Sequence, residues 1–267
     1  MLRPGDTRET RFCFSQSDFD AFARLSGDDN PIHVDPEFAA RTKFGRTVAH
    51  GMMLFGFLDA ATAAWVGGPV AIHEQELTFR APTFAGEDIV ATLLAEDGGE
   101  GRLRIAEEIV RPDGLLSAEG FTVVGNEEGL PAVAPAERPE PSDDLFGITP
   151  GMTATAARAF TAGDVAAYRD LVGDSNPRHD NAVPAPLLGG LVSYLLGTEL
   201  PGRGTNWLRQ RFRFHGPVPI GAGVTATVEV VRVRPDKALV DLAATLVVAG
   251  ETVATGGSLV LISDLER

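Results

Sequence analysis

The sequence predicts an α+β fold of two repeated domains, in each of which an antiparallel sheet wraps around one buried helix. The phrase Asp-Asp-Asn-Pro-Ile-His at residues 28–33 returns as Asp-Ser-Asn-Pro-Arg-His at residues 174–179. Between residues 14–33 and 160–179, nine of twenty positions are identical without a gap. An apolar helical segment followed by strand-like segments also occurs in each half. Two copies of one domain are the simplest explanation.

The first half opens with a short strand and a short helix. Residues 8–14 alternate weakly and indicate a strand. Ser17 is the expected N-cap of the helix, and Gly27 is expected to end it. Residues 36–41 indicate a further helical turn after the repeated phrase.

A long buried helix and an antiparallel meander complete the first half. Residues 51–65 are apolar on almost every face, which is typical of a buried helix rather than a surface one. Turn residues then separate four strand-like segments. These strands are expected at residues 73–79, 88–94, 102–110 and 115–124.

The second half repeats this plan in a shorter form. Phe-Arg-Ala-Pro at residues 79–82 corresponds to Phe-His-Gly-Pro at 214–217, so eleven residues are missing before this point. The second buried helix is expected at about residues 187–196. Residues 126–149 are rich in proline and acidic residues and are expected to form a linker. The predicted domains are therefore residues 1–125 and 150–267.

Composition narrows the function classes. A net charge of −14 argues against binding to nucleic acid or to an anionic membrane. Cys13 is the single cysteine, which excludes an intrachain disulfide and a cysteine-based metal site. The five histidines lack zinc-ligand spacing and no glycine-rich phosphate loop is present, so no metal and no cofactor are expected. No apolar signal core or membrane span is visible, and a cytoplasmic location is expected.

The repeated phrase carries a candidate catalytic pair. Asp28 and His33 lie five residues apart across an Asn-Pro turn, and such a carboxylate and imidazole can activate water by general acid–base catalysis. Gly51 begins the buried helix, where its N–H has no intrahelical partner and lies at the positive end of the helix dipole. That N–H suits an oxyanion, and glycine lets a substrate approach closely.

These residues resemble a known family. Residues 25–35, followed by Phe-Gly at 44–45 and Val-Ala-His-Gly-Met at 48–52, resemble the MaoC-like, R-specific enoyl-CoA hydratase (3-hydroxyacyl-thioester dehydratase) family. The resemblance implies a hot-dog fold in each half, fused as a double hot dog whose sheets join in a pseudo-dimer. It also implies that Asp28 and His33 are catalytic and that the partner is an acyl thioester of coenzyme A or acyl carrier protein. A homodimer of such chains is a further expectation.

Several other side chains are candidates for binding substrate. Asn30 either shapes the loop or contacts substrate, and His50 either supports the helix start or acts as a second base. Asp59 is the only charge in the buried helix, and it either contacts substrate or is satisfied by backbone or water. Basic residues that either meet the phosphates of the carrier or form solvated surface charge are Arg41, Lys43, Arg46 and Arg80.

The second copy keeps Asp174 and His179 but is expected to be inactive. At an offset of 135 residues, Gly51 falls on Pro186, which has no N–H to stabilise an oxyanion. In double-hot-dog relatives a degenerate half leaves room for a bulky acyl chain, and the resemblance implies that role here.

The sequence therefore predicts reversible hydration of trans-2-enoyl thioesters, or dehydration of (R)-3-hydroxyacyl thioesters. It leaves open the direction, the acyl chain, the carrier and the pathway, whether fatty acid, polyketide or catabolic. One alternative is a hot-dog thioesterase with Asp59 as base or nucleophile, against which the intact Asp28 and His33 loop argues. Another is a pseudo-enzyme subunit that binds acyl thioesters without reaction.

Overall fold

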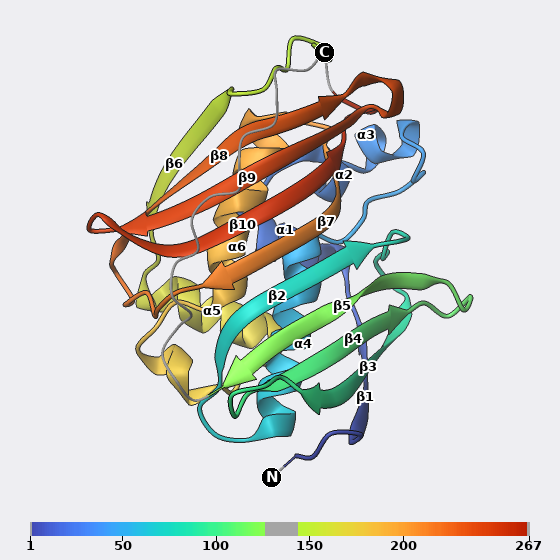
Figure 1. Ribbon diagram of the computed structural model, residues 1–267. Coiled ribbons are helices and arrows are strands. Elements are labelled where there is room, and N and C mark those ends of the chain that lie inside the picture. The colour runs from blue at the N-terminus through green and yellow to red at the C-terminus, as the bar shows by residue number, and fades with distance from the viewer. Residues whose placement is uncertain (1, 126–143, 266–267) are drawn as a thin grey trace.

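A computed structural model describes residues 2–125 and 144–265 as one continuous sheet folded around a layer of helices (Figure 1). The strand order is β1-β3-β4-β5-β2-β7-β10-β9-β8-β6, and every neighbouring pair is antiparallel. The strands are β1 Thr7–Cys13, β2 Ala71–Phe79, β3 Asp88–Asp97, β4 Leu103–Val110, β5 Leu116–Gly125, β6 Thr153–Ala159, β7 Asn206–Phe214, β8 Gly223–Arg234, β9 Leu239–Val248 and β10 Glu251–Leu261.

The two halves meet where β2 pairs with β7. Each half contributes five strands in the same internal order, reflected about this pair. Glu74 lies opposite Arg213 and Thr78 opposite Arg209. The buried Gln210 amide also donates to the side-chain oxygen of Gln75. The predicted double hot dog with joined sheets is confirmed.

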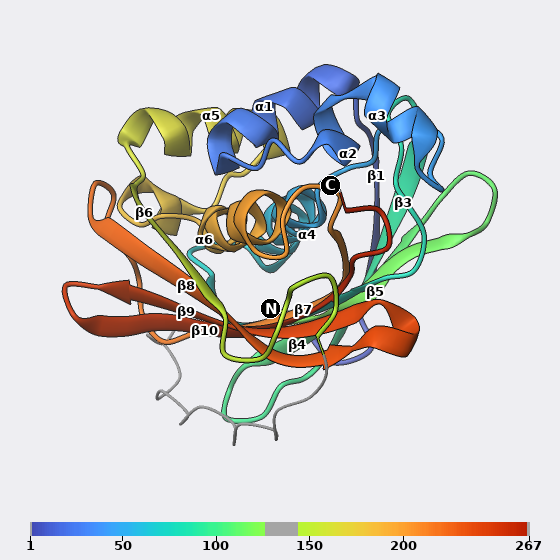
Figure 2. The same cartoon turned by 90° about the horizontal axis from the view of Figure 1, so that it is seen from above.

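Two helices lie side by side in the concave face of the sheet, and two others cover them (Figure 2). The central pair is α4 and α6, and the covering pair is α1 and α5. The helices are α1 Gln16–Ser26, α2 Pro31–Val34, α3 Pro36–Arg41, α4 Gly51–Val66, α5 Ala162–Val172 and α6 Ala185–Tyr194, with short turns η1 Pro177–Asp180, η2 Leu195–Glu199 and η3 Pro235–Lys237.

Helix α4 is buried, as its composition predicts. Met52, Met53, Phe55 and Leu58 are each 0% exposed, because the sheet encloses one side of the helix and α5 and α6 pack against it. Across the described residues, the helices are all too short or too polar to cross a membrane.

One sequence prediction about a helix start is wrong. The N-cap of α1 is Ser15 rather than Ser17, because Asp18 stands three residues after Ser15 and the two residues form a reciprocal capping box. Helix α6 begins at Ala185, two residues before the predicted start, since proline is well tolerated in a first helical turn. The other predicted helices and strands agree with the observed bounds to within three residues.

The predicted linker lies mostly in residues 126–143, which are outside the described residues. Its last part is packed. Leu145 and Ile148 are each 6% exposed and pair through their backbones. The chain thus rejoins the core before residue 150, and the predicted domain division stays a prediction.

Candidate active site

The repeated phrase forms a tight loop between α1 and α3. Gly27 ends α1 in the left-handed conformation, with φ of 84°, which glycine adopts without strain. Asn30 then caps the single turn of α2, in which Pro31 occupies the first position. This turn places His33 on the same side of the loop as Asp28.

The Asp28 carboxylate is buried and held by both halves of the molecule. Its Oδ1 accepts a hydrogen bond from the N–H of Asn30 at 3.2 Å, and its Oδ2 accepts one from the hydroxyl of Ser193 in α6. Gly197 in η2 lies so near that a Cβ there would be 2.5 Å from Oδ1. Burial raises the pKa of Asp28 to about 7, although the Ser193 hydrogen bond opposes the rise.

His33 is a neutral base at pH 7. Its Nδ1 lies 2.7 Å from the carbonyl oxygen of Val48, which can only accept, so Nδ1 carries the proton. Burial lowers the pKa of His33 to about 4. Its Nε2 therefore presents a lone pair that can receive a proton from water.

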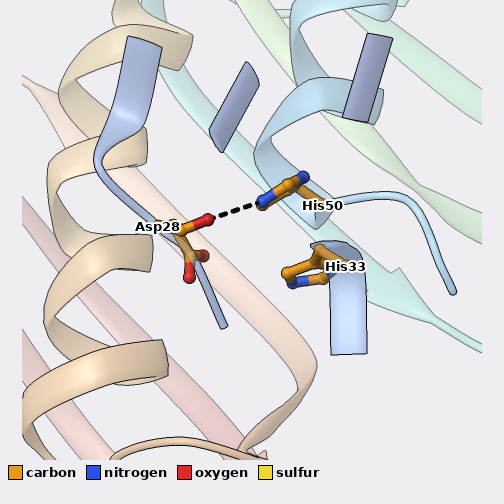
Figure 3. A group of neighbouring side chains, drawn as sticks. All are labelled: Asp28, His33 and His50. Atoms are coloured by element: carbon orange, nitrogen blue, oxygen red, sulfur yellow. Dashed lines mark hydrogen bonds between the residues drawn. The ribbon is translucent and has the colours of Figure 1, made fainter. Parts of the chain in front are cut away.

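His50 contacts both Asp28 and His33. Its ring stacks on that of His33 with centroids 3.8 Å apart, and its Nε2 donates to the backbone oxygen of Asp28 at 3.0 Å. Figure 3 shows the Asp28 carboxylate and the His33 ring on one side of this hydrogen bond. These contacts favour the supporting role for His50 over that of a second base.

Gly51 is the first residue of α4, directly after His50. Its N–H has no partner within the helix. A Cβ at this position would lie 2.5 Å from Cζ of Phe79, so only glycine fits without a shift of that ring. The hydrogen bond between His50 and the Asp28 backbone ties this helix start to the loop that carries Asp28 and His33.

The ligand atoms of Asp28, His33 and His50 lie within 4.8 Å of one another, as they would around a metal ion. The two imidazole rings, however, are stacked with an angle of only 25° between their planes. A ligand nitrogen donates its lone pair in the plane of its ring, to an ion about 2.0–2.1 Å away for zinc. Lone pairs in two stacked rings do not converge on one ion, and the arrangement suits acid–base chemistry better.

Asn30 joins the loop to the other half of the molecule. Its amide nitrogen donates to the oxygen of Thr205 at 3.0 Å, and its oxygen accepts from the N–H of Gly204 at 3.0 Å. With both ends of the amide engaged by backbone, its shaping role is the one the geometry favours.

The four basic candidates are exposed at the surface. The Arg41 and Lys43 side chains lie over the rings of Phe38 and Phe44. The other two candidates are ion-paired, Arg46 with Glu87 and Arg80 with Glu119. Both of these arginines are more than half exposed, and such exposed pairs exchange readily with other anions.

Asp59 belongs to the surroundings of the second motif. Burial raises its pKa to about 7, and the charges that act on it are those of His179 and Asp174. Within the described residues, its buried Oδ2 has no hydrogen-bond partner. The structure does not bring Asp59 together with Asp28 and His33.

The second motif is organised differently from the first. Asp174 and His179 contact one another directly, with Oδ2 and Nδ1 2.7 Å apart. In the first motif no such contact forms, because the Nδ1 of His33 is turned to Val48.

The alignment of Gly51 with Pro186 is wrong by one residue. The N–H of Val183 donates to the carbonyl oxygen of Val218, as the N–H of Ala49 donates to that of Thr83. Two N–H groups of α6 donate to the carbonyl oxygen of Pro184, and two of α4 donate to that of His50. Gly51 therefore corresponds to Ala185, which has an N–H. The second helix start therefore does have an N–H donor, contrary to the sequence prediction. The second motif still differs from the first in the direct contact between Asp174 and His179.

Sequence reasoning missed Ser193 and Gly197. Neither belongs to the repeated phrase, and both reach Asp28 only because α6 packs beside the first motif. One signal was available. At the offset of 134 that relates the two helix starts, Ser193 corresponds to Asp59, the charge that stood out in the first buried helix.

Comparisons with known proteins place the chain among known sequences and folds. The family model for the MaoC like domain matches residues 3–112. Over 101 residues the chain is 40% identical to 3-hydroxybutyryl-CoA dehydratase from Methylorubrum extorquens. This alignment covers 36% of this chain and 64% of the relative. Over 116 residues it is 37% identical to (R)-specific enoyl-CoA hydratase from Aeromonas caviae, covering 42% of this chain and 85% of the relative. The chain thus spans a little under two thirds of the first relative and most of the second.

A solved structure resembles the whole chain. It is a conserved hypothetical protein from Mycobacterium tuberculosis, described as having a double hotdog fold. The match has a TM-score of 0.77 and 14% identity, and it covers 97% of this chain and 96% of that one. At that identity the likeness shows the fold alone.

Proposed function

Because the chain belongs to the MaoC-like dehydratase family, we propose that it catalyses the reversible hydration of trans-2-enoyl thioesters to (R)-3-hydroxyacyl thioesters. The observation that carries the proposal is the pairing of a buried Asp28 carboxylate with the free Nε2 of a neutral His33. The working residues are Asp28, His33 and the N–H of Gly51.

Asp28 is the proton carrier in this proposal. A single water molecule donates one hydrogen bond to the Asp28 carboxylate and its other hydrogen bond to Nε2 of His33. The oxygen of this water molecule attacks C3 of the enoyl thioester. The pKa of Asp28 is about 7 and that of His33 about 4, so the carboxylate is the stronger base and takes the proton. The carboxylic acid then delivers that proton to C2.

Negative charge develops on the thioester oxygen during the attack. The electron pair of the C2–C3 double bond moves toward that oxygen, and the N–H of Gly51 stabilises it at the positive end of α4. Proton delivery to C2 returns Asp28 to its ionised form. Dehydration runs through the same steps in reverse and also begins with ionised Asp28.

The test is the reaction of the purified protein with trans-2-butenoyl-CoA. Loss of the conjugated enoyl-thioester absorbance, no release of free thiol and formation of the (R)-3-hydroxy product are the expected results. Release of free thiol would identify a thioesterase instead. Binding without either change would identify a pseudo-enzyme, and both of these outcomes overturn the proposal.

We assign the carrier phosphates to basic residues exposed at the surface. Arg41 and Lys43 lie on the segment 41–46 that the second half lacks, and among the described residues neither forms an ion pair. Neutralising both, as Arg41→Gln with Lys43→Gln, is expected to raise KM for a CoA thioester while kcat changes little. An unchanged KM would remove the assignment.

Pairing of two such chains into a homodimer stays a prediction. Its test is the mass of the protein in solution, measured by light scattering during gel filtration. A mass of one chain would contradict it.

A further inference from the structure

A small pocket opens at the second motif, away from Asp28 and His33. Arg178, His179 and Ala185 line it, together with apolar side chains that include Val70, Leu188 and Phe214. None of its lining residues is acidic, in a chain with a net charge of −14. Its volume is about 60 Å³. The lining of the pocket thus combines two basic side chains with apolar ones.

His179 is the buried titratable side chain in the lining of the pocket. Burial alone would lower its pKa, but the hydrogen bond with Asp174 and the charge of Asp59 outweigh burial and raise it. Nδ1 is turned to Asp174, which leaves Nε2 for the pocket, and within the described residues Nε2 has no hydrogen-bond partner. The imidazole Nε2 of His179 therefore faces the cavity, and the raised pKa of this ring favours its protonated form.

Arg178 and the start of α6 add two further donors. Within the described residues, no carboxylate forms an ion pair with the Arg178 guanidinium. The N–H of Ala185 has no partner inside the helix, because Ala185 is its first residue. Together with His179 they bring three unused donors to one cavity.

The same geometry makes this motif unsuited to hydration. The Asp174 and His179 side chains touch, so no water fits between them as it does in the proposed mechanism at the first motif. Where Ser193 supports Asp28 in the first site, the corresponding residue here is Asp59, a second carboxylic acid. Asp59 and Asp174 both raise the pKa of His179, which favours its charged form and so the binding of an anion.

We propose that this pocket is a second binding site, for a short-chain carboxylate whose carboxylate group pairs with His179 and Arg178 and accepts a hydrogen bond from Ala185. The apolar walls fit a hydrocarbon tail, which an inorganic anion lacks. At about 10–15 Å³ of such volume for each water-sized atom, the cavity holds roughly four to six atoms, as in butyrate. The site is separate from the proposed hydration site and does not depend on its activity.

The test is calorimetric titration of the full-length protein with butyrate, with butyramide and with inorganic phosphate. Butyrate is expected to bind at one site per chain. Butyramide has the same shape without the charge and is expected to bind at least tenfold more weakly, because charge-assisted hydrogen bonds are lost. Equal binding of butyramide, or phosphate binding as tight as that of butyrate, would overturn the carboxylate assignment. So would the absence of butyrate binding at tens of millimolar.

Butyrate binding to four variants tests where on the protein butyrate binds. Arg178→Gln and His179→Gln are each expected to weaken butyrate binding at least tenfold, while Arg24→Gln on the exposed face of α1 leaves it unchanged. Arg178 is partly exposed, so its variant decides the matter if His179→Gln fails to fold. Asp28→Asn should keep full affinity. Loss of binding in Asp28→Asn, or full affinity in Arg178→Gln, would show that butyrate occupies another place and would refute the proposal.

Discussion

Removing the hydroxyl of Ser193 is expected to shift the pH dependence of hydration. Ser193 donates a hydrogen bond to the buried Asp28 carboxylate, and this bond lowers the pKa of that group against the effect of burial. Ser193→Ala therefore raises the pKa of Asp28. Because the ionised carboxylate is the base in the proposed mechanism, kcat/KM falls at neutral pH and recovers at alkaline pH.

The size of the shift follows from the hydrogen bond. A hydrogen bond to a charged group contributes about 1.5–3 kcal/mol, and one pKa unit corresponds to about 1.4 kcal/mol. Asp28 is 2% exposed, so little of this is lost to solvent screening. The midpoint of the pH profile should move from about 7 to about 8–9. At pH 7 the ionised fraction then falls from about one half to roughly 1–10%, and kcat/KM falls about 5- to 50-fold.

The assay is kcat/KM for an enoyl thioester measured between pH 5 and 10. Wild type is expected to rise through pH 7 to a plateau, and Ser193→Ala to reach a comparable plateau at higher pH. Ser258→Ala is the matched control, because its hydroxyl lies buried on β10 and has no hydrogen-bond partner in the described part of the chain. An equal loss at every pH would refute the reasoning about Ser193. A wild-type rate that falls above pH 7 would instead assign Asp28 the role of acid and His33 that of base.

Three further predictions concern the same site. Gly197→Ala places a Cβ 2.5 Å from Oδ1 of Asp28 and is expected to lower kcat about 100-fold by displacing the carboxylate. The control Gly223→Ala, whose Cβ would have nothing within 4 Å, should leave kcat unchanged, and equal kcat in the two variants would contradict the prediction. Gly51→Ala is expected to abolish turnover because its Cβ meets the ring of Phe79, and adding Phe79→Leu in the same chain should restore part of the turnover. A fully active Gly51→Ala variant would show that the close contact between residue 51 and Phe79 does not matter. Treatment with a chelator is expected to leave turnover unchanged, and a loss that one added metal ion restores would reverse the conclusion about the stacked histidines.

Most of the fold could be predicted because the chain repeats itself and its patterns are local. The apolar run of α4 indicates burial wherever it occurs, and turn residues separate the strands of the first meander. The errors fall at helix starts, where neighbouring residues compete. Both Ser15 and Ser17 suit a cap, and Asp18 decides for Ser15 because it lies three residues after it.

The site divides in the same way. Asp28, His33 and Gly51 carry a motif and could be found from the sequence. Ser193 and Gly197 could not, because their relation to Asp28 exists only after α6 packs against the first motif. Asp59 attracted notice as a lone charge, but its neighbours His179 and Asp174 come from the other half. Side chains supplied across the junction of two repeats leave no signal in local spacing.

The measurement that tests the central claim most directly compares Asp28→Asn with Asp174→Asn. Turnover of an enoyl thioester is measured for both variants, with circular dichroism to confirm that each is folded. Asp28→Asn is expected to lower kcat by about 10²- to 10⁴-fold, the usual contribution of a general acid–base group, while Asp174→Asn keeps most of the wild-type rate. If folded Asp174→Asn loses as much activity as Asp28→Asn, the assignment of catalysis to the first motif is wrong.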